Sequence, residues 1–531
     1  MKLEKKKIYY LIFGLILIIA VLSRVLLINK IPGDISPDEA FAGYNAFSIL
    51  KYGGRDSFGY KFPMYLTAWG SGMNVLESYL SIPFIALFGN HNYSIRIIMV
   101  ICSILSLVCV YGIVKELSGD IKLSLFSFFI CSIMPWHIMM SRWGLESDLA
   151  PSFLIFSLYF FVKGLKNEKF FMISSLLYGL TIYAYAVTWP ALFIIVLLQI
   201  VYAIVCKKIK LTRYAVISIF ILIIMSLPAF LFLMVNYGLI GEIHLPFMSI
   251  PKLVAFRNNE IGLSNIPGNI LNMLEIVNLG DGMSQNTPEG VGLFYYFSVP
   301  FIIIGMVPVI KKAVSSIKSK EISLEAIILI QFIGAVVIGI LVDVNVTKIN
   351  IIFMPLSLIL SYGIYKICEM IEKKNIIIVP VLLYMFLFVN FERIYFLEYQ
   401  SNCFKYNYCQ DASKALLYVK NQILKNEDYK DCKINITADI SYPIVLYYME
   451  ENLDKYLETV EYTNYPDEYL QVESFDNILM NVNYNETVED ENVYIVNNEM
   501  CNGSVLIDSL KDNNYENYDF GIYGVYYKKR N

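Results

Sequence analysis

The sequence predicts an α-helical polytopic membrane protein with a small α/β domain at its C-terminal end. Of its 531 residues, 57% are hydrophobic and only 17% are charged. In a soluble domain, about a quarter of all residues are charged. Apolar stretches of roughly 20 residues, the length of a bilayer-spanning helix, recur through the first 396 positions. Lipid is therefore expected to be the solvent around most of this part.

The apolar stretches predict about eleven membrane spans. They fall at residues 8–28, 94–114, 123–140, 149–165, 170–188, 190–206, 214–235, 294–310, 323–342, 350–369 and 375–391. The apolar stretch 79–88 is too short to cross a bilayer, and it is predicted to form an interfacial or re-entrant helix.

Lysine and arginine placement predicts the orientation, because these residues favour cytoplasmic loops. With a cytoplasmic N-terminus, every short loop on the inner side is basic, and the long loops on the outer side carry few bases. The inner loops lie near residues 115–122, 163–169, 207–213, 311–320 and 366–374. We expect a multi-pass protein of the cell membrane with two large extracytoplasmic loops, 29–93 and 236–293, and an extracytoplasmic C-terminal domain.

The chain divides by charge at about residue 397. Residues 397–531 carry 24 acidic and 11 basic side chains, a net charge of −13, while the chain as a whole has −4. Helix-like stretches alternate there with short β-rich ones. We therefore predict a multi-span domain over 1–396 and an acidic extracytoplasmic α/β domain over 397–531. No basic, arginine-rich domain of the kind that binds nucleic acid is present.

Cysteine and histidine usage argues against a metal or redox centre. The nine cysteines form no CxxC pair, and the chain has three histidines. Cys403, Cys409, Cys432 and Cys501 lie in the tail, where they could pair as disulfides outside the cell or remain reduced. No cofactor and no metal ligand set are predicted, and a requirement for a divalent cation stays open.

The first loop contains a helix start that places two acids together. In the run SPDEA, Ser36 is predicted as the N-cap, Pro37 as the first helical residue and Glu39 as the third. An amphipathic helix is expected over 40–52. In one interpretation, Asp38 and Glu39 do no more than stabilise the positive end of the helix dipole. Glu39 has the capping role, so Glu39→Gln should be mild, whereas Asp38 has no such task and is a candidate general base.

A second acidic group follows the third predicted span. Arg142 lies four residues before Glu146 and six before Asp148. In one reading these are interfacial residues, with the arginine stem along the lipid and an acid capping the next helix. In the other, either acid belongs to a site, because charges this close to a bilayer are costly unless they are paired or used.

Isolated cations accompany these acids on the outer side. Lys61, Arg96, Arg142 and Lys348 could each be a plain topology residue, or they could together bind the phosphate of a lipid.

These features resemble the GT-C superfamily of integral membrane glycosyltransferases. The likeness is to the dolichyl-phosphate-mannose–protein mannosyltransferase branch and its bacterial relatives, the aminoarabinose transferases. It rests on the first helix followed by Asp38-Glu39, Lys61-Phe62-Pro63 leading to Trp69, the run ending in Arg96, the acid opening the fourth span, and Lys348 with Pro355. The chain departs from the aminoarabinose transferases at Tyr60-Lys61-Phe62-Pro63, where they have Glu-Lys-Pro-Pro.

The resemblance implies transfer of a sugar from a polyprenyl-phosphate donor to an acceptor hydroxyl at the outer face, with inversion. The acceptor would be a protein, a glycan or a lipid of the cell envelope. Asp38 would be the catalytic base and Glu146 or Asp148 the second acid. Glu39, Lys61, Arg96, Arg142 and Lys348 are the candidate substrate-binding residues. The alternatives are a transporter or flippase of lipid-linked glycans and a receptor or scaffold that presents the C-terminal domain.

Overall fold

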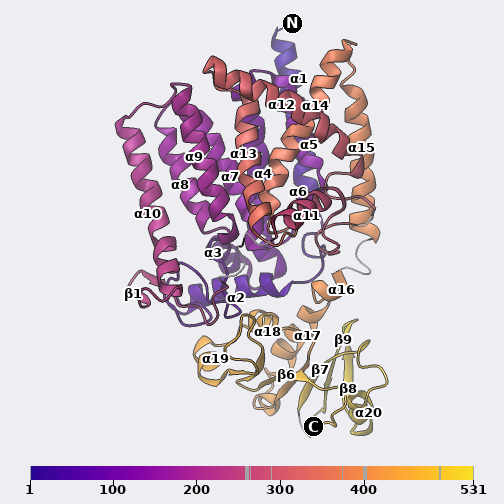
Figure 1. The fold of residues 1–531 in the computed structure, drawn as a ribbon. Helices are drawn as coiled ribbons and strands as arrows, with labels where there is room; N and C mark the ends of the chain where they lie inside the picture. Colours follow the sequence, from indigo (N-terminus) through magenta and orange to yellow (C-terminus); the bar gives the residue numbers. More distant parts are fainter. Residues whose placement is uncertain are drawn as a thin grey trace. The chain divides into compact units, whose positions relative to one another are not determined.

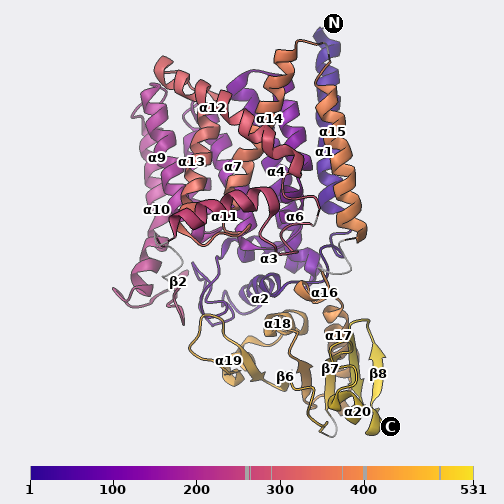
Figure 2. The same ribbon diagram turned by 45° about the vertical axis from the view of Figure 1, so that its right-hand side comes forward.

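The computed structural model describes residues 2–257, 262, 265–288, 290–373, 375–398, 404–489 and 492–529. The chain forms two compact units (Figures 1 and 2). The membrane unit comprises Met1–Ile28, Ile98–Leu231 and Asn258–Tyr399. The loop unit comprises Asn29–Ile97, Phe232–Arg257 and Gln400–Asn531.

The membrane unit is a bundle of long helices. Its helices are α1 (Lys2–Val25), α4 (Asn92–Ser118), α5 (Ile121–Ile133), α6 (Pro135–Met140), α7 (Glu146–Gly164), α8 (Phe170–Ile182), η1 (Ala186–Thr188), α9 (Trp189–Val205), α10 (Arg213–Asn236), α11 (Ile266–Leu279), η2 (Tyr296–Ser298), α12 (Val299–Ser319), α13 (Leu324–Leu341), η3 (Asn350–Ile352), α14 (Phe353–Ile371), α15 (Ile378–Arg393) and η4 (Ile394–Glu398). The first residues of α4 and the last of α10 extend into the loop unit.

All eleven apolar stretches of the sequence are helical over most of their length. Among the described residues, however, eight helices are both long and apolar enough to cross a membrane: α1, α4, α9, α10, α12, α13, α14 and α15, some with a flanking short helix. The other three stretches contain α5, α7 and α8. The helical membrane fold is confirmed, and the count of eleven spans is not.

Proline explains the break between α5 and α6. Pro135 has no N–H for a helical hydrogen bond, and its ring disfavours helical dihedrals in the residue before it. Met134 accordingly has φ −68° and ψ 130°, and Pro135 opens the next helix. The stretch predicted as one span, 123–140, is therefore two helices.

Small residues allow a close contact between α12 and α14. A Cβ added at Gly305 would lie 2.6 Å from the Ile359 carbonyl oxygen, and one at Gly363 would lie 2.6 Å from the Gly305 Cα. Packing of this kind stabilises membrane helices because apolar side chains alone gain little over lipid.

The loop unit gathers the two long loops and the C-terminal domain. From the loops come α2 (Pro37–Lys51), α3 (Leu76–Phe88) and the antiparallel pair β1 (Ile243–Leu245) and β2 (Met248–Ile250). Helix α2 begins as the sequence predicts, but it is not amphipathic, because its residues from Glu39 to Ile49 are all buried. It packs against α3 and against α18 (Tyr442–Met449) of the C-terminal domain.

The C-terminal domain is built around a seven-stranded mixed sheet of order β4-β5-β6-β3-β7-β9-β8. Strand β3 pairs in parallel with β6 and β7, and the other pairs are antiparallel. Its strands are β3 (Ile434–Thr437), β4 (Glu461–Tyr462), β5 (Val472–Phe475), β6 (Ile478–Val482), β7 (Val493–Asn497), β8 (Glu516–Asp519) and β9 (Tyr523–Tyr527). Its helices besides α18 are α16 (Phe404–Asn407), α17 (Ala412–Tyr418), η5 (Val419–Ile423), η6 (Glu427–Tyr429), α19 (Leu453–Thr459) and α20 (Val505–Asp512). The predicted small α/β domain is confirmed.

The tail cysteines are free thiols where the structure describes them. Cys409, Cys432 and Cys501 are buried and unbonded to one another, and Cys403 lies outside the described residues.

Candidate functional site

Asp38 is half-buried in the first turn of α2 and is held by a residue of the following loop. The indole Nε1–H of Trp69 donates a hydrogen bond of 2.9 Å to Asp38 Oδ1. Among the described residues, none donates a hydrogen bond to Oδ2 of the same carboxylate. Asp38 therefore has one oxygen fixed in direction and one available to take a proton from a hydroxyl.

Backbone conformation aims the Trp69 side chain. Trp69 has a φ of +61°, a left-handed conformation that a bulky residue adopts only where its surroundings impose it. Its carbonyl oxygen accepts a 2.8 Å hydrogen bond from the Leu470 N–H of the C-terminal domain. The next residue, Gly70, packs so closely that an added Cβ would lie 2.8 Å from the Asp467 carbonyl oxygen. The C-terminal domain thus fixes the loop that orients Asp38.

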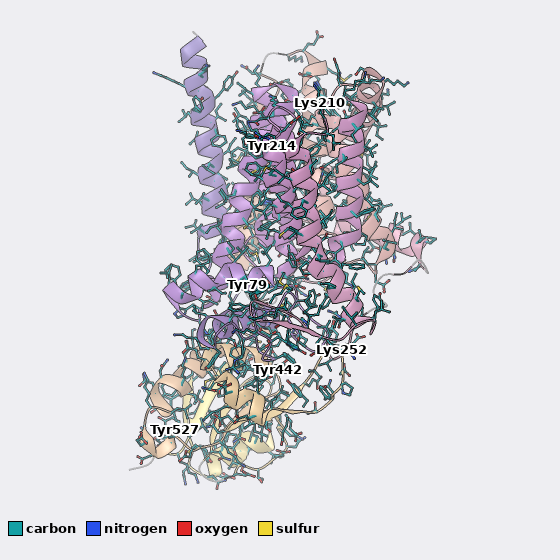
Figure 3. The ribbon with its side chains drawn as sticks, turned by 90° about the vertical axis from the view of Figure 1, so that its left-hand side faces the viewer. Tyr79, Lys210, Tyr214, Lys252, Tyr442 and Tyr527 are labelled. Carbon is teal, nitrogen blue, oxygen red and sulfur yellow. The ribbon has the colours of Figure 1, made fainter. Side chains whose placement is uncertain are left out.

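An aromatic cluster surrounds this pair. The Trp69 ring lies 5.3 Å from the Phe41 ring and 5.5 Å from the Tyr442 ring, centroid to centroid. In the view of Figure 3, Tyr442 lies between Tyr79 of α3 and Tyr527 of β9. Tyr442 is buried, and its hydroxyl has no hydrogen-bond partner among the described residues. The cluster lowers the local dielectric constant next to the carboxylate, which strengthens electrostatic effects there.

Burial raises the pKa of Asp38 above its ordinary value, and the Trp69 hydrogen bond and the charge of Arg257 oppose this increase in pKa. The charge of Glu39 raises the pKa of Asp38 further. Arg257 is held over the Tyr469 ring, 5.4 Å from its centroid, and donates a 2.8 Å hydrogen bond to the Tyr469 hydroxyl. A carboxyl group with a raised pKa is a stronger base than an exposed aspartate.

Glu39 is buried in an ion pair with Arg96. Both side chains are 0% exposed, and Arg96 Nε and Nη2 donate to the two carboxylate oxygens of Glu39 at 2.7 and 3.0 Å. Arg96 also donates to the carbonyl oxygens of Gly33 and Asp34. The capping box with Ser36 is present as predicted. The two side chains therefore hold each other in place, and their assignment as substrate-binding residues stays a prediction.

Asp34, the third acid of this loop, links the loop to the C-terminal domain. Its Oδ2 accepts a hydrogen bond from the Ser413 N–H and its Oδ1 one from the Tyr448 hydroxyl, each at 2.8 Å. Both oxygens are used in this way, so Asp34 is structural.

The acids after the third predicted span lie in the membrane unit, at the start of α7. Glu146 is the first residue of that helix and is half-buried. Asp148 is 8% exposed, and its Oδ1 accepts hydrogen bonds of 3.3 Å from the Ser147 hydroxyl and from the amide of Asn350. The Asn350 amide also donates to the Ser147 carbonyl oxygen at 2.8 Å. Asp148 therefore joins the start of α7 to the segment before α14.

Arg142 is buried in the membrane unit. It is 0% exposed, donates to the carbonyl oxygens of Ser23 and Leu26 at 3.1 and 2.7 Å, and lies 4.9 Å from the centroid of the Phe396 ring. These contacts join the end of α1 to η4, which follows α15. Arg142 therefore holds these helix ends together, and its assignment as a substrate-binding residue stays a prediction.

The two lysine candidates keep more of their side chains accessible. Lys61 is exposed in the first loop, with its Nζ 6.0 Å from the centroid of the Phe62 ring. Lys348 is half-buried ahead of η3, and its backbone N–H donates to Asn345 Oδ1.

Sequence reasoning missed the residues that surround Asp38. Tyr442 and Tyr469 come from the C-terminal domain and Arg257 from the second long loop, more than 200 positions away in the chain. Trp69 ends the motif that begins at Lys61, and that motif gives it no role. No local pattern connects such distant positions, and an alignment of related chains showing paired changes is the signal that could have found them.

Comparisons with known proteins agree with this architecture. Residues 75–232 match the model of the family described as dolichyl-phosphate-mannose-protein mannosyltransferase. A search of curated proteins finds no match to this chain. The matched segment runs from the start of α3 into α10, and the matched family is one of glycosyltransferases.

Solved structures resemble the fold over nearly the whole chain. ArnT from Cupriavidus metallidurans bound to undecaprenyl phosphate has a TM-score of 0.52 at 10% identity, and the match covers 97% of both chains. The same protein in the apo state gives a TM-score of 0.52 at 11% identity, with 98% of both chains covered. The oligosaccharyltransferase of Archaeoglobus fulgidus gives 0.50 at 12% identity, covering 85% of this chain and 64% of that one.

The chain therefore has the fold of GT-C superfamily membrane glycosyltransferases, as its sequence predicted. The structural similarity to ArnT includes the C-terminal domain. The family match over residues 75–232 adds a similarity in sequence.

Proposed function

We propose that this protein transfers a sugar from a polyprenyl-phosphate carrier to an acceptor hydroxyl, with Asp38 as the base. The observation that carries the proposal is the Asp38 carboxylate, raised in pKa, with one oxygen fixed by Trp69 and the other available. The ArnT structure with undecaprenyl phosphate supports a lipid-phosphate donor for a chain of the same fold.

The reaction is a single displacement with inversion. Asp38 Oδ2 accepts the proton of the acceptor hydroxyl while the hydroxyl oxygen attacks the anomeric carbon of the sugar. The bond from that carbon to the phosphate oxygen breaks, and the polyprenyl phosphate leaves with both electrons of the bond. Lysine side chains that stabilise this anion would lower the barrier, and accessible Lys61 and Lys348 are the candidates.

Of the two candidate second acids, we assign the ligand-facing role to Glu146. Asp148 is more buried and its Oδ1 already accepts from Ser147 and Asn350, which suits a positioning residue. Glu146 is the more accessible of the two and lies in the first turn of α7, where the helix dipole favours a negative charge.

We place the reaction at the extracytoplasmic face, with the N-terminus cytoplasmic. The support is the basic charge of the short inner loops. Outside the cell neither ATP nor a nucleotide sugar is supplied, which fits a leaving group delivered on a lipid.

Membrane vesicles of defined sidedness test the function and its side together. Vesicles from cells that express the protein receive radiolabelled sugars on polyprenyl phosphate, and acceptor fractions are separated afterwards, with and without a chelator. We expect covalent label in a protein, glycan or lipid fraction of right-side-out vesicles supplied with an impermeant acceptor. Movement of labelled donor across the bilayer without covalent transfer would instead identify a flippase.

The Trp69→Phe variant tests the hydrogen bond to Asp38. Phenylalanine keeps a ring against Phe41 and Tyr442 but removes the N–H that stabilises the ionised carboxylate. The pKa of Asp38 should rise further, so the acidic limb of the pH profile of kcat/KM should move to higher pH.

The matched control is Tyr442→Phe. It removes from the same cluster a hydroxyl that makes no hydrogen bond to any residue the structure describes. This variant should leave the acidic limb where it is in the wild type. An unmoved limb in Trp69→Phe would mean that Asp38 is not the group that titrates.

A further inference from the structure

A cavity of the membrane unit is lined by none of the residues assigned to sugar transfer. It has a volume of about 550 Å³ and opens between α1, α5, α14 and α15. Figure 2 shows α1 and α15 running side by side. Its walls are mainly apolar side chains, among them Ile16, Ile19 and Phe126. A cavity of this size and lining accommodates a hydrocarbon chain.

Polar residues gather at one end of this cavity. Lys122 and Lys373 line it together with Tyr9 and Tyr365. Both lysines are exposed, and neither makes an ion pair within the described residues. Tyrosine and lysine at the end of an apolar groove are the side chains that bind at the level of lipid headgroups.

The acids nearby are already engaged. Asp120 accepts hydrogen bonds from the N–H groups of Lys122 and Leu123, and the Tyr365 hydroxyl donates to its other oxygen at 2.7 Å. Glu369, which lines the cavity, pairs with Lys366 at 2.6 Å. Neither of these acids forms an ion pair with Lys122 or Lys373 within the described residues, so the two ammonium groups can bind a phosphate at this end of the cavity.

This end is opposite to the one with the candidate site residues of the membrane unit. Lys122 is at the start of α5, and Arg142 follows the end of α6. Asn350 precedes α14, and Lys373 follows its last residue. The 19 residues of α14 span about 28 Å at 1.5 Å per residue. The cavity is therefore separate from the acids at the start of α7.

We propose that this cavity is a binding site for one anionic phospholipid of the bilayer. The acyl chain of this lipid lies along α1, α5 and α15, and Lys122 and Lys373 bind the lipid phosphate. A zwitterionic lipid would fill the same groove but would gain less from the two lysines, since its own cation offsets the phosphate charge. Basic pockets between membrane helices at this depth favour anionic headgroups, with about 1 kcal/mol for each lysine near the surface.

Native mass spectrometry of the full-length protein in detergent tests the proposal. The protein is titrated with phosphatidylglycerol or with phosphatidylcholine of the same acyl chains. We expect one phosphatidylglycerol to bind roughly tenfold or more tightly than phosphatidylcholine. In Lys122→Ala/Lys373→Ala the preference should fall to within about threefold. Ile19→Trp, which fills the groove, should weaken both lipids.

The matched control is Lys311→Ala/Lys312→Ala, which removes two exposed lysines of α12 that do not line the cavity. It should keep the wild-type preference. Equal affinity of the wild type for the two lipids would overturn the proposal, as would a preference that survives Lys122→Ala/Lys373→Ala. Displacement of phosphatidylglycerol by an equimolar polyprenyl phosphate would overturn it too, because the site would then belong to the sugar carrier.

Discussion

Asp38→Asn is expected to lower turnover by about 10² to 10⁴ without unfolding the protein. Asparagine keeps the shape of the side chain, and its carbonyl oxygen can still accept the Trp69 hydrogen bond. It cannot take a proton from the acceptor hydroxyl. The lost carboxylate contributes at most about 1 kcal/mol to the start of α2 through the helix dipole. The measurement is sugar transfer by purified variants alongside a thermal melt.

Asp34→Asn is the control, because this neighbouring acid binds Ser413 and Tyr448 and has no place in the reaction. It should lower the melting temperature while each folded molecule keeps its turnover to within a few-fold. A fully active Asp38→Asn enzyme with a normal melt would exclude Asp38 as the base.

Glu39→Gln is expected to be strongly destabilising, contrary to what the capping box alone predicts. Glutamine can make the capping hydrogen bond, but it leaves the Arg96 guanidinium buried without its carboxylate. Removing one partner of a fully buried ion pair typically costs about 3–5 kcal/mol. The loss should appear as a large drop in the melting temperature and in the yield of folded protein.

Ser36→Ala separates the two contributions of Glu39. It removes the serine side of the capping box and leaves the ion pair intact, so it should cost only about 1 kcal/mol. A Glu39→Gln protein that melts like Ser36→Ala would mean that the charge of Arg96 is compensated by other groups.

The sequence by itself determined the class of protein and the local structure of the first loop. Apolar stretches fixed where the membrane helices lie, since a bilayer admits helices whose backbone groups are satisfied internally. The run from Ser36 to Glu39 determined where α2 begins, because cap, proline and capping box lie within four residues. Alternation of helix-like and β-rich stretches likewise predicted the α/β tail.

Only the tertiary structure decided what the charged residues of that loop do. Glu39 meets Arg96 across 57 positions, and Asp38 meets Trp69 across 31. Helix α2 reads as one-sided in sequence, yet it is buried all round because α18 covers the face that would otherwise meet water. A cap or a span depends on residues within a few turns, whereas burial and charge pairing depend on which distant segments meet. The role proposed for Asp38 therefore depends on contacts that no local sequence pattern contains.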